Sequence, residues 1–268
     1  MNSKLFSNIC KKIRQRIIRS LYLAEGGHAG SSLSIVEILT YLYFDRKILS
    51  SKKYEKFVLS KGHAAPALYA TLNLIGKLND KELHSLRKIN SKLQGHPDRK
   101  LIKDINAGTG ALGQGLSMSI GFAIAERLKN TKKKSFCLIG DGEMQEGQIW
   151  EAAMYAGANK INNICAILDN NKMQNETYTK STLNVYPIRE KWLAFNWNVY
   201  EINGHSYGQI KNAFNKFYKS KNKPTLIIAN TIKGKGVSFM ENNNLWHYKN
   251  PNLKELKISL NEINKNYA

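Results

Sequence analysis

The alternation of short apolar runs with helix-like segments constrains the fold more than any other feature of this sequence. Residues 135–139 and 163–168 are apolar runs of strand length, and residues 145–159 between them have the pattern of a helix. The alternation continues with a helix at 188–196, a strand at 197–202, a helix at 207–219 and a strand at 224–230. Apolar strands separated by helices predict an α/β fold, in which a parallel sheet is flanked by helices on both faces.

The first half of the chain adds mainly helices to this sheet. Leu5, Ile9, Ile13, Ile17 and Leu21 form an apolar stripe between basic residues, which predicts a helix over residues 4–24. No internal repeat and no clear linker is visible, so we predict a single domain over residues 1–268, with a loop-rich C-terminal extension from about residue 233. The other expected elements of this half are helices at 34–44, 64–76, 80–88 and 112–128 and a short strand at 57–60.

The charge of the chain is strongly basic. Its 268 residues include 41 Lys and Arg against 20 Asp and Glu, a formal net charge of +21. Such a charge is found in proteins that bind nucleic acid or an anionic membrane surface, and in chains with a solvated basic surface. The lysines are spread along the chain, the longest basic run is 132–134, and no helix-turn-helix, zinc-finger, RNP or KH motif is present. This distribution favours a solvated surface, and a basic nucleic-acid-binding protein is the alternative.

The cysteines and the hydropathy of the chain indicate the cellular compartment in which the protein resides. Cys137 and Cys165 lie in predicted strands and Cys10 in a basic helix, without the spacing of a disulfide framework, so we expect reduced thiols. No apolar run reaches 18 residues, and the basic N-terminal segment has no apolar core followed by a cleavage site. These features predict a cytoplasmic protein without a membrane partner.

Polar residues follow two of the predicted strands where each strand ends. Gly140-Asp141-Gly142 follows the first central strand, and Asn170-Asn171 closes the second. Because parallel strands bring their carboxyl ends to one edge, Asp141 and Asn171 converge if the two strands are neighbours. Their oxygen atoms suit Mg²⁺ or Ca²⁺, and the glycines allow backbone N–H groups to approach a phosphate. A plain turn at Gly140-Asp141-Gly142 is the alternative.

Several loops are rich in glycine and histidine. Residues 90–111 have little periodicity and much turn chemistry, which is typical of a functional loop. The predicted helix that follows begins with glycine and small residues, which suits a close backbone approach. His84 lies on a polar helix face and is expected to be solvated, and His205 is expected to be a turn residue. The other four histidines, in glycine-containing loops or polar segments, are candidates for function: His28, His63, His96 and His247.

The motifs taken together resemble transketolase. Gly140-Asp141-Gly142 followed by Asn170-Asn171 matches the thiamine-diphosphate motif of thiamine-dependent enzymes, and the transketolase-like segments occur in the family's order from about residue 10 to about residue 250. Those segments are 57–69, 140–153, Gly27-His28-Ala29-Gly30, Gly95-His96-Pro97, 109–115 and Trp246-His247-Tyr248.

The resemblance implies a thiamine-diphosphate-binding fold and a role for each matching residue. Asp141, the Asn171 side chain and the Met173 carbonyl would hold Mg²⁺, with Ca²⁺ or Mn²⁺ as substitutes, and Asn171 would thereby also belong to the cofactor site. His63, His247 and Gly142 would contact the diphosphate, and Gly110, Ala111 and Leu112 would lie along the cofactor's rings. His28, His63, His96 and His247 would be the catalytic histidines, with Glu146 in a carboxylate network at the subunit interface. Histidines that titrate near neutral pH would suit the proton transfers of this chemistry.

The resemblance covers only the first of the three domains of a complete transketolase. It implies the N-terminal half of a transketolase that transfers a two-carbon ketol unit from a ketose phosphate to an aldose phosphate in the pentose phosphate pathway. A separate C-terminal subunit would carry the pyrimidine-binding domain, in a dimer of heterodimers, unless the chain is a fragment. The alternatives within thiamine enzymes are subunits similar to 1-deoxyxylulose-5-phosphate synthase or to the E1 α chain of a 2-oxoacid dehydrogenase.

Overall fold

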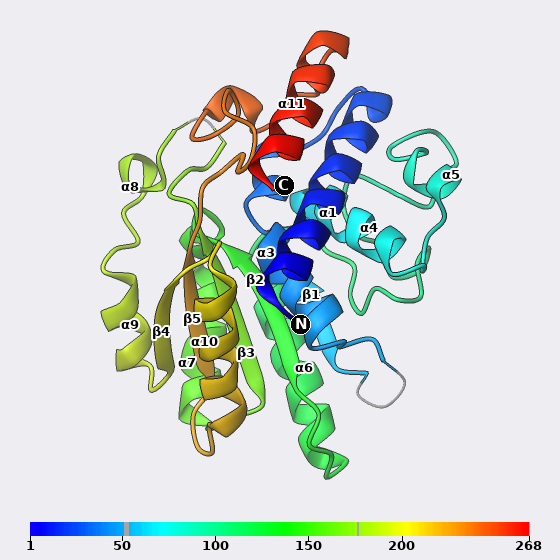
Figure 1. Cartoon of the computed structure of the whole chain (residues 1–268). Helices are drawn as coiled ribbons and strands as arrows, with labels where there is room; N and C mark the ends of the chain where they lie inside the picture. The colour runs from blue at the N-terminus through cyan, green and yellow to red at the C-terminus, as the bar shows by residue number, and fades with distance from the viewer. Residues whose placement is uncertain (51–53, 176, 268) are drawn as a thin grey trace.

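A five-stranded parallel sheet forms the centre of the molecule in the computed structural model, which describes residues 1–50, 54–175 and 177–267 (Figure 1). The strand order is β1-β2-β3-β5-β4, and every neighbouring pair is parallel. The strands are β1 (Lys56–Leu59), β2 (Ser135–Gly140), β3 (Ile164–Asn170), β4 (Asn198–Asn203) and β5 (Thr225–Asn230). The parallel α/β sheet predicted from the sequence is confirmed.

The strands β2 and β3 are buried along their whole length because both faces of the sheet are covered. Successive side chains of a strand point to opposite faces, so each strand supplies two cores. Leu138 of β2 and Ile167 of β3 belong to one core, whereas Ile139 and Leu168, one residue further along, belong to the other. The helices therefore form two layers around the sheet, as expected.

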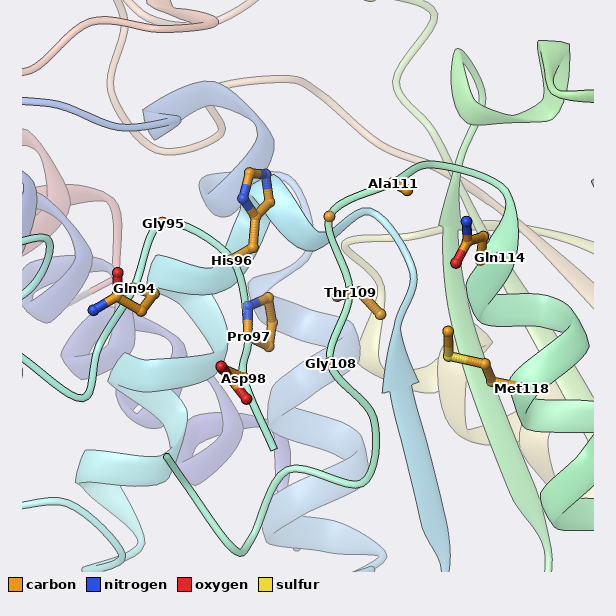
Figure 2. Close-up of a pocket in the computed structure, with 11 residues that line it drawn as sticks. Gln94, Gly95, His96, Pro97, Asp98, Gly108, Thr109, Ala111, Gln114 and Met118 are labelled. Carbon is orange, nitrogen blue, oxygen red and sulfur yellow. The ribbon is translucent and has the colours of Figure 1, made fainter. Parts of the chain in front are cut away.

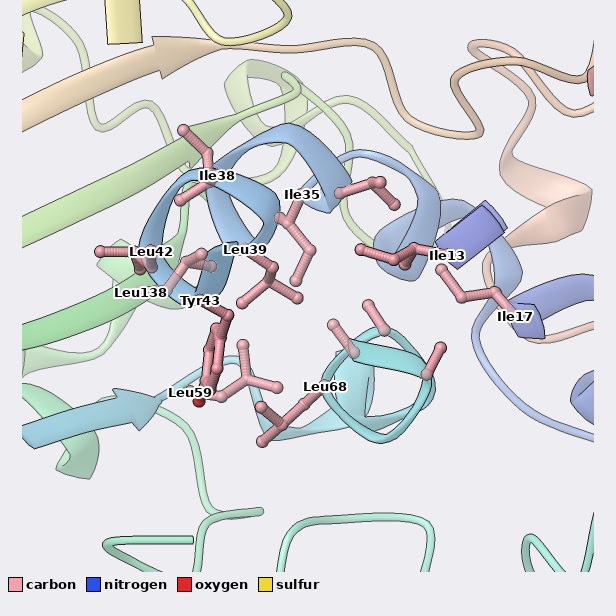
Figure 3. Close-up of a cluster of buried hydrophobic side chains, with 14 of the residues drawn as sticks. Ile13, Ile17, Ile35, Ile38, Leu39, Leu42, Tyr43, Leu59, Leu68 and Leu138 are labelled. Carbon is pink, nitrogen blue, oxygen red and sulfur yellow. The ribbon is translucent and has the colours of Figure 1, made fainter. Parts of the chain in front are cut away.

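The larger core is covered by helices from both ends of the chain. Figure 3 shows Ile13, Ile17, Ile35, Leu39 and Leu68 converging with strand residues Leu59 and Leu138. The helices on this face are α1 (Ser3–Ala24), α2 (Ala29–Leu33), α3 (Val36–Thr40), the π-helix η1 (Tyr41–Asp45), α4 (Ala65–Leu74), α10 (Tyr207–Lys219) and α11 (Leu253–Asn266). The opposite face is covered by α6 (Gln114–Leu128), α7 (Gly147–Ala158) and α9 (Ile188–Ala194).

Some helices are shorter or more broken than the sequence pattern predicts. The expected helix at 34–44 begins as a turn at Ser34 and Ile35 and is then divided into α3 and η1. The expected helix at 80–88 ends early as α5 (Asp80–Leu83). Arg87 and Asn90 have left-handed backbone conformations, with φ of 61° and 62°, which a helix cannot contain. The remaining short elements are the 3₁₀ turns η2 (Gly62–Ala64), η3 (Glu143–Gln145) and η4 (Asn244–Trp246) and the helix α8 (Thr179–Thr182).

The predicted loop-rich extension from residue 233 is wrong for its last part. Residues 233–252 are mostly irregular, but Leu253–Asn266 form the helix α11, which packs alongside α1 (Figure 1). Asn252 and Glu255 form a capping box at its start, and Leu256 and Ile263 are buried on its inner face. The helix is therefore stabilised both by its cap and by burial of its apolar stripe.

Two further observations concern cysteines and membranes. Cys10, Cys137 and Cys165 are buried free thiols, as the sequence predicts. Among the described residues, no helix combines the length and the apolar character that crossing a bilayer requires.

Candidate active site

A cavity of about 340 Å³ lies at the edge of the sheet where β1, β2 and β3 end. Ligands of parallel α/β sheets bind at this edge, because loops there are free to vary while the strands hold them in place. Ala111 is the one predicted site residue outside the lining. The predicted residues that do line the cavity are His28, His63, His96, Gly110, Leu112, Asp141, Gly142, Glu146, Asn171, Met173 and His247.

Ala111 lies instead in an adjoining hollow of about 500 Å³. Figure 2 shows this hollow between the loop that carries His96 and the loop that leads into α6. His96 and Gly110 line both the hollow and the cavity, so the two spaces share a wall. The turn-rich segment 90–111, predicted to be a functional loop, thus borders the cavity.

Asp141 and Asn171 converge because β2 and β3 are neighbours, with Gly140 paired to Asp169. Asp141 is buried and accepts hydrogen bonds from the N–H groups of Gly142 and Lys172. Burial and the nearby charge of Asp169 raise the pKa of Asp141 to about 7. Among the described residues, Asp141 forms no ion pair with a Lys, Arg or His side chain. Because buried charges are normally paired or bound to a metal, a carboxylate in this position is suited to bind a cation.

The donor set at this point fits a hard divalent cation. Asn171 donates from Nδ2 to Asp169 at 2.9 Å, and its Oδ1 accepts the N–H of Met173 at 3.0 Å. The Asp141 carboxylate, this amide oxygen and backbone carbonyls are the oxygen ligands that Mg²⁺ prefers. Within the described part of the chain, no cluster of three His, Cys, Asp or Glu side chains could hold a metal.

A buried ion pair between Lys61 and Asp169 lies beside this pair of residues. Asp169 also accepts hydrogen bonds from Ser34 at 2.7 Å, from Thr231 and from Asn171. Burial raises the pKa of Asp169, but Lys61 and these hydrogen bonds outweigh it and lower the pKa below its usual value. Asp169 thereby fixes the Asn171 amide, and neither Lys61 nor Asp169 was predicted from the sequence.

Glu143, which was also not predicted, ties three segments together at the same edge. Its buried carboxylate accepts hydrogen bonds from Ser60 Oγ, from Gly113 N at 2.9 Å and from Gly140 N at 3.0 Å. A Cβ at Gly115 would lie 2.3 Å from Ser60 Oγ, so only glycine permits this approach. The close approach predicted for the glycine-rich start of α6 is therefore made to Ser60, at the end of β1.

Three histidines from distant segments form a cluster on one wall of the cavity. The ring centroids of His28 and His63 are 5.1 Å apart, those of His28 and His247 are 5.2 Å apart, and those of His63 and His247 are 5.7 Å apart. Tyr248 packs edge-on against His28 at 5.0 Å. All three histidines were candidates from their loop positions in the sequence alone.

These histidines are neutral at neutral pH, which corrects the expectation that they titrate there. Burial and the charge of His96 lower the pKa of His28 to about 4, and burial and the charge of Lys233 lower the pKa of His247 to about 3. Burial and Lys61 hold the pKa of His63 well below its usual value. The neutral rings can each donate one hydrogen bond and accept one.

The two histidines that were not functional candidates, His84 and His205, lie where the sequence predicts. His84 is exposed at the end of α5. His205 lies in a turn, where Nδ1 contacts Glu37 at 3.0 Å and Nε2 accepts the N–H of Ile232 at 2.9 Å. Both ring nitrogens of His205 are therefore satisfied within the fold.

The fold and the site define a parallel α/β protein whose ligand cavity combines a buried carboxylate, an amide oxygen and neutral histidines. The family described as "Transketolase, thiamine diphosphate binding domain" matches residues 6–263. The chain belongs to this family.

Relatives of matching length are components of transketolases. The chain is 37% identical over 260 residues to an apulose-4-phosphate transketolase subunit of Phocaeicola vulgatus, and the match covers 95% of this chain and 92% of the relative. It is 39% identical over 262 residues to the 6-deoxy-6-sulfo-D-fructose transketolase subunit SqwG of a Clostridium species, covering 94% and 95% respectively.

Other relatives are longer than this chain. The crystal structure of transketolase from Campylobacter jejuni superposes with a TM-score of 0.91 at 30% identity, over 98% of this chain but 43% of that chain. Rat transketolase is 37% identical over 245 residues, which is 38% of its length. The chain therefore spans less than half the length of these two transketolases.

Proposed function

We propose that this chain is the thiamine-diphosphate-binding subunit of a split transketolase. The observation that carries the proposal is the buried Asp141–Asn171 pair at the carboxyl edge of the sheet, facing a cavity lined by neutral histidines. Two relatives of matching length are described as transketolase subunits, which supports a separate partner chain with the pyrimidine-binding domain. The assembly we propose is a dimer of heterodimers, in which Glu146 joins a carboxylate network at the subunit interface.

The cofactor site is assigned to residues that fit both parts of the group. Asp141, Asn171 and the Met173 carbonyl would hold Mg²⁺, and Gly142, His63 and His247 would contact the diphosphate. Gly110, Ala111 and Leu112 would lie along the rings. Thiamine diphosphate, when bound, supplies the chemistry that breaks and forms a carbon–carbon bond beside a carbonyl.

The substrates we propose are a ketose phosphate donor and an aldose phosphate acceptor of the pentose phosphate pathway, in the cytoplasm. His28 and His96 would bind the oxygens of these sugars. Because the pKa values of both rings are lowered, they would act as hydrogen-bonding groups that orient the sugar and not as fixed positive charges. The names of the relatives supply two further sugars to test, apulose 4-phosphate and 6-deoxy-6-sulfofructose.

A reconstitution assay tests the proposed function. The purified chain, its partner and their mixture would each receive thiamine diphosphate, Mg²⁺, xylulose 5-phosphate and ribose 5-phosphate. We expect ketol transfer only in the mixture, and transfer by the chain alone at an ordinary enzyme rate would contradict the proposal of a split enzyme. A parallel panel with pyruvate and with the two sugars of the relatives as donors separates transketolase from other thiamine enzymes and identifies the preferred ketose.

A further inference from the structure

Lys233 is a fully buried lysine that approaches the cavity without lining it. Its Nζ lies 2.9 Å from the carbonyl oxygen of Gln174 and 2.8 Å from Nδ1 of His247. Among the described residues no carboxylate forms an ion pair with it, whereas Lys235, two residues later, pairs with Glu241 at 3.2 Å. Lys233 is thus directed at a histidine of the cavity wall and not at an acid.

This contact determines which nitrogen of His247 carries the proton. A lysine ammonium has three donors and no acceptor, so Nδ1 of His247 must accept. In a neutral imidazole the single ring proton then resides on Nε2. The ring itself lines the cavity, beside His28 and His63.

The chain makes room for the Lys233 side chain at Gly30. A Cβ at Gly30 would lie 2.9 Å from Cγ of Lys233, and the Gly30 carbonyl accepts the N–H of Gly234 at 3.0 Å. Gly234 has a φ of 81°, and a Cβ there would lie 2.2 Å from the Met240 carbonyl oxygen. Gly30 therefore leaves the space that the Lys233 side chain fills, and Gly234 permits the close approach of the chain to Met240 directly after it.

A largely buried network of hydrogen bonds holds the backbone on both sides of Lys233. Before it, the N–H of Ile232 donates to His205 Nε2 at 2.9 Å, and after it the Lys235 carbonyl accepts from Arg14 Nε at 2.9 Å. Glu37 joins the two anchors, since it contacts His205 Nδ1 at 3.0 Å and accepts from Arg14 at 2.9 Å. Buried hydrogen-bond networks of this kind rigidify the segments that they connect.

We propose that Lys233 is a positioning residue that fixes His247 in the Nε2–H tautomer, so that His247 offers the cavity a hydrogen-bond donor. The consequence for catalysis rests on the proposed function. A donor at this place suits a phosphate oxygen or another anionic oxygen, whereas the opposite tautomer would present a lone pair that repels it.

The tautomer can be measured directly by long-range ¹⁵N–¹H NMR of the full chain with ¹⁵N-labelled histidine, without cofactor or partner. The signals of His247 would be assigned by their loss in His247→Gln. We expect a protonated Nε2 and an unprotonated Nδ1 in the wild type and in Lys233→Arg, which keeps a cationic donor. In Lys233→Met we expect a population with a protonated Nδ1, and in the matched control Lys235→Met no change.

Two results would overturn the proposal: a protonated Nδ1 in the wild type, or the wild-type tautomer persisting in Lys233→Met. If Lys233→Met does not fold, the spectra of the wild type and of Lys233→Arg test the proposal on their own, because a protonated Nδ1 of His247 in either protein contradicts it. In the reconstituted enzyme, Lys233→Met should lower kcat/KM about ten- to a hundredfold, as loss of a charged hydrogen bond does. The NMR result does not depend on ketol transfer, so failure of the proposed function and failure of this inference are distinguishable.

Discussion

Asp141 is the side chain on which the proposed metal site depends most. Asp141→Asn keeps the size of the side chain and removes its charge, so Mg²⁺ would lose its only anionic protein ligand among those proposed. We expect the affinity of the reconstituted enzyme for thiamine diphosphate in Mg²⁺ to fall at least about a hundredfold, measured by calorimetric titration. Asp104→Asn is the matched control, since Asp104 pairs with Lys77 at 3.3 Å on the surface. Unchanged affinity in Asp141→Asn would remove Asp141 from the site.

Glu37 makes the free energy of unfolding depend on pH in the acidic range. Burial raises the pKa of Glu37, but the charge of Arg14 and the hydrogen bond from His205 outweigh it, and the pKa falls from 4.5 to about 2. Because the pKa is lower in the folded state, the stabilisation is complete above about pH 4.5 and is lost as pH falls toward 2. The difference between the folded and unfolded pKa of Glu37 corresponds to about 3 kcal/mol of the free energy of unfolding.

The variant Glu37→Gln tests this ion pair. At pH 7 we expect the free energy of unfolding to fall by about 3–5 kcal/mol, because Arg14 is left buried without its counter-charge. The difference from the wild type should shrink as pH falls from 5 to 3, measured by urea unfolding at each pH. Glu190→Gln, at an exposed position on α9, should behave as the wild type. A difference that stays constant with pH would show that Glu37 does not titrate as described.

Residues recognised from the sequence stand in loops directly after strands or beside glycines, where polar side chains have no role in packing. Asp141, Asn171 and the loop histidines were found in this way. Lys61 and Lys233 were missed because their partners are far away in the sequence: Asp169 is 108 residues from Lys61, and His247 is 14 residues from Lys233 in an irregular segment. The lowered histidine pKa values also depend on burial and on these lysines, which no local pattern contains.

Among the elements, the strands were predictable and the helix boundaries of the first half were not. Each central strand is an apolar run that ends in glycine or asparagine, so both its burial and its end are encoded locally. The helices α2 and α3, on either side of the break, both pack against α1 and α4, and such distant contacts are not contained in the local sequence pattern. The helix α11 could have been found from Asn252 and Glu255, spaced as a capping box ahead of Leu256 and Ile263.

The helix α6 carries two glycines with opposite surroundings, which gives a matched pair of variants. In Gly115→Ala the new Cβ would meet Ser60 at 2.3–2.8 Å, so we expect a loss of about 1–3 kcal/mol in the free energy of unfolding. In Gly121→Ala nothing lies within 4 Å, so a gain of about 0.5–1 kcal/mol from helix propensity is expected. Urea unfolding of the chain measures both, and equal effects would contradict the described contact between α6 and β1.

At the scale of the whole molecule, the basic charge and the site are separate features. The longest basic run, residues 132–134, lies between α6 and the start of β2, whereas the cavity lies where β2 ends. Inside the site, Lys61 and Lys233 are buried and engaged with Asp169, Gln174 and His247. The lysines that could attract a polyanion are therefore not those that shape the cavity.

This separation predicts how the chain responds to nucleic acid. We expect duplex DNA to bind without sequence preference, with a Kd of about 10⁻⁴–10⁻⁶ M at physiological salt that weakens steeply as salt rises. The double variant Lys132→Gln/Lys133→Gln should reduce the salt dependence and leave ketol transfer by the reconstituted enzyme unchanged, because both residues are far from the cavity edge. Fluorescence anisotropy with specific and random duplexes over a salt series measures the binding. A preference of about a thousandfold or more for one sequence would instead make nucleic acid a specific partner and give the charge a function of its own.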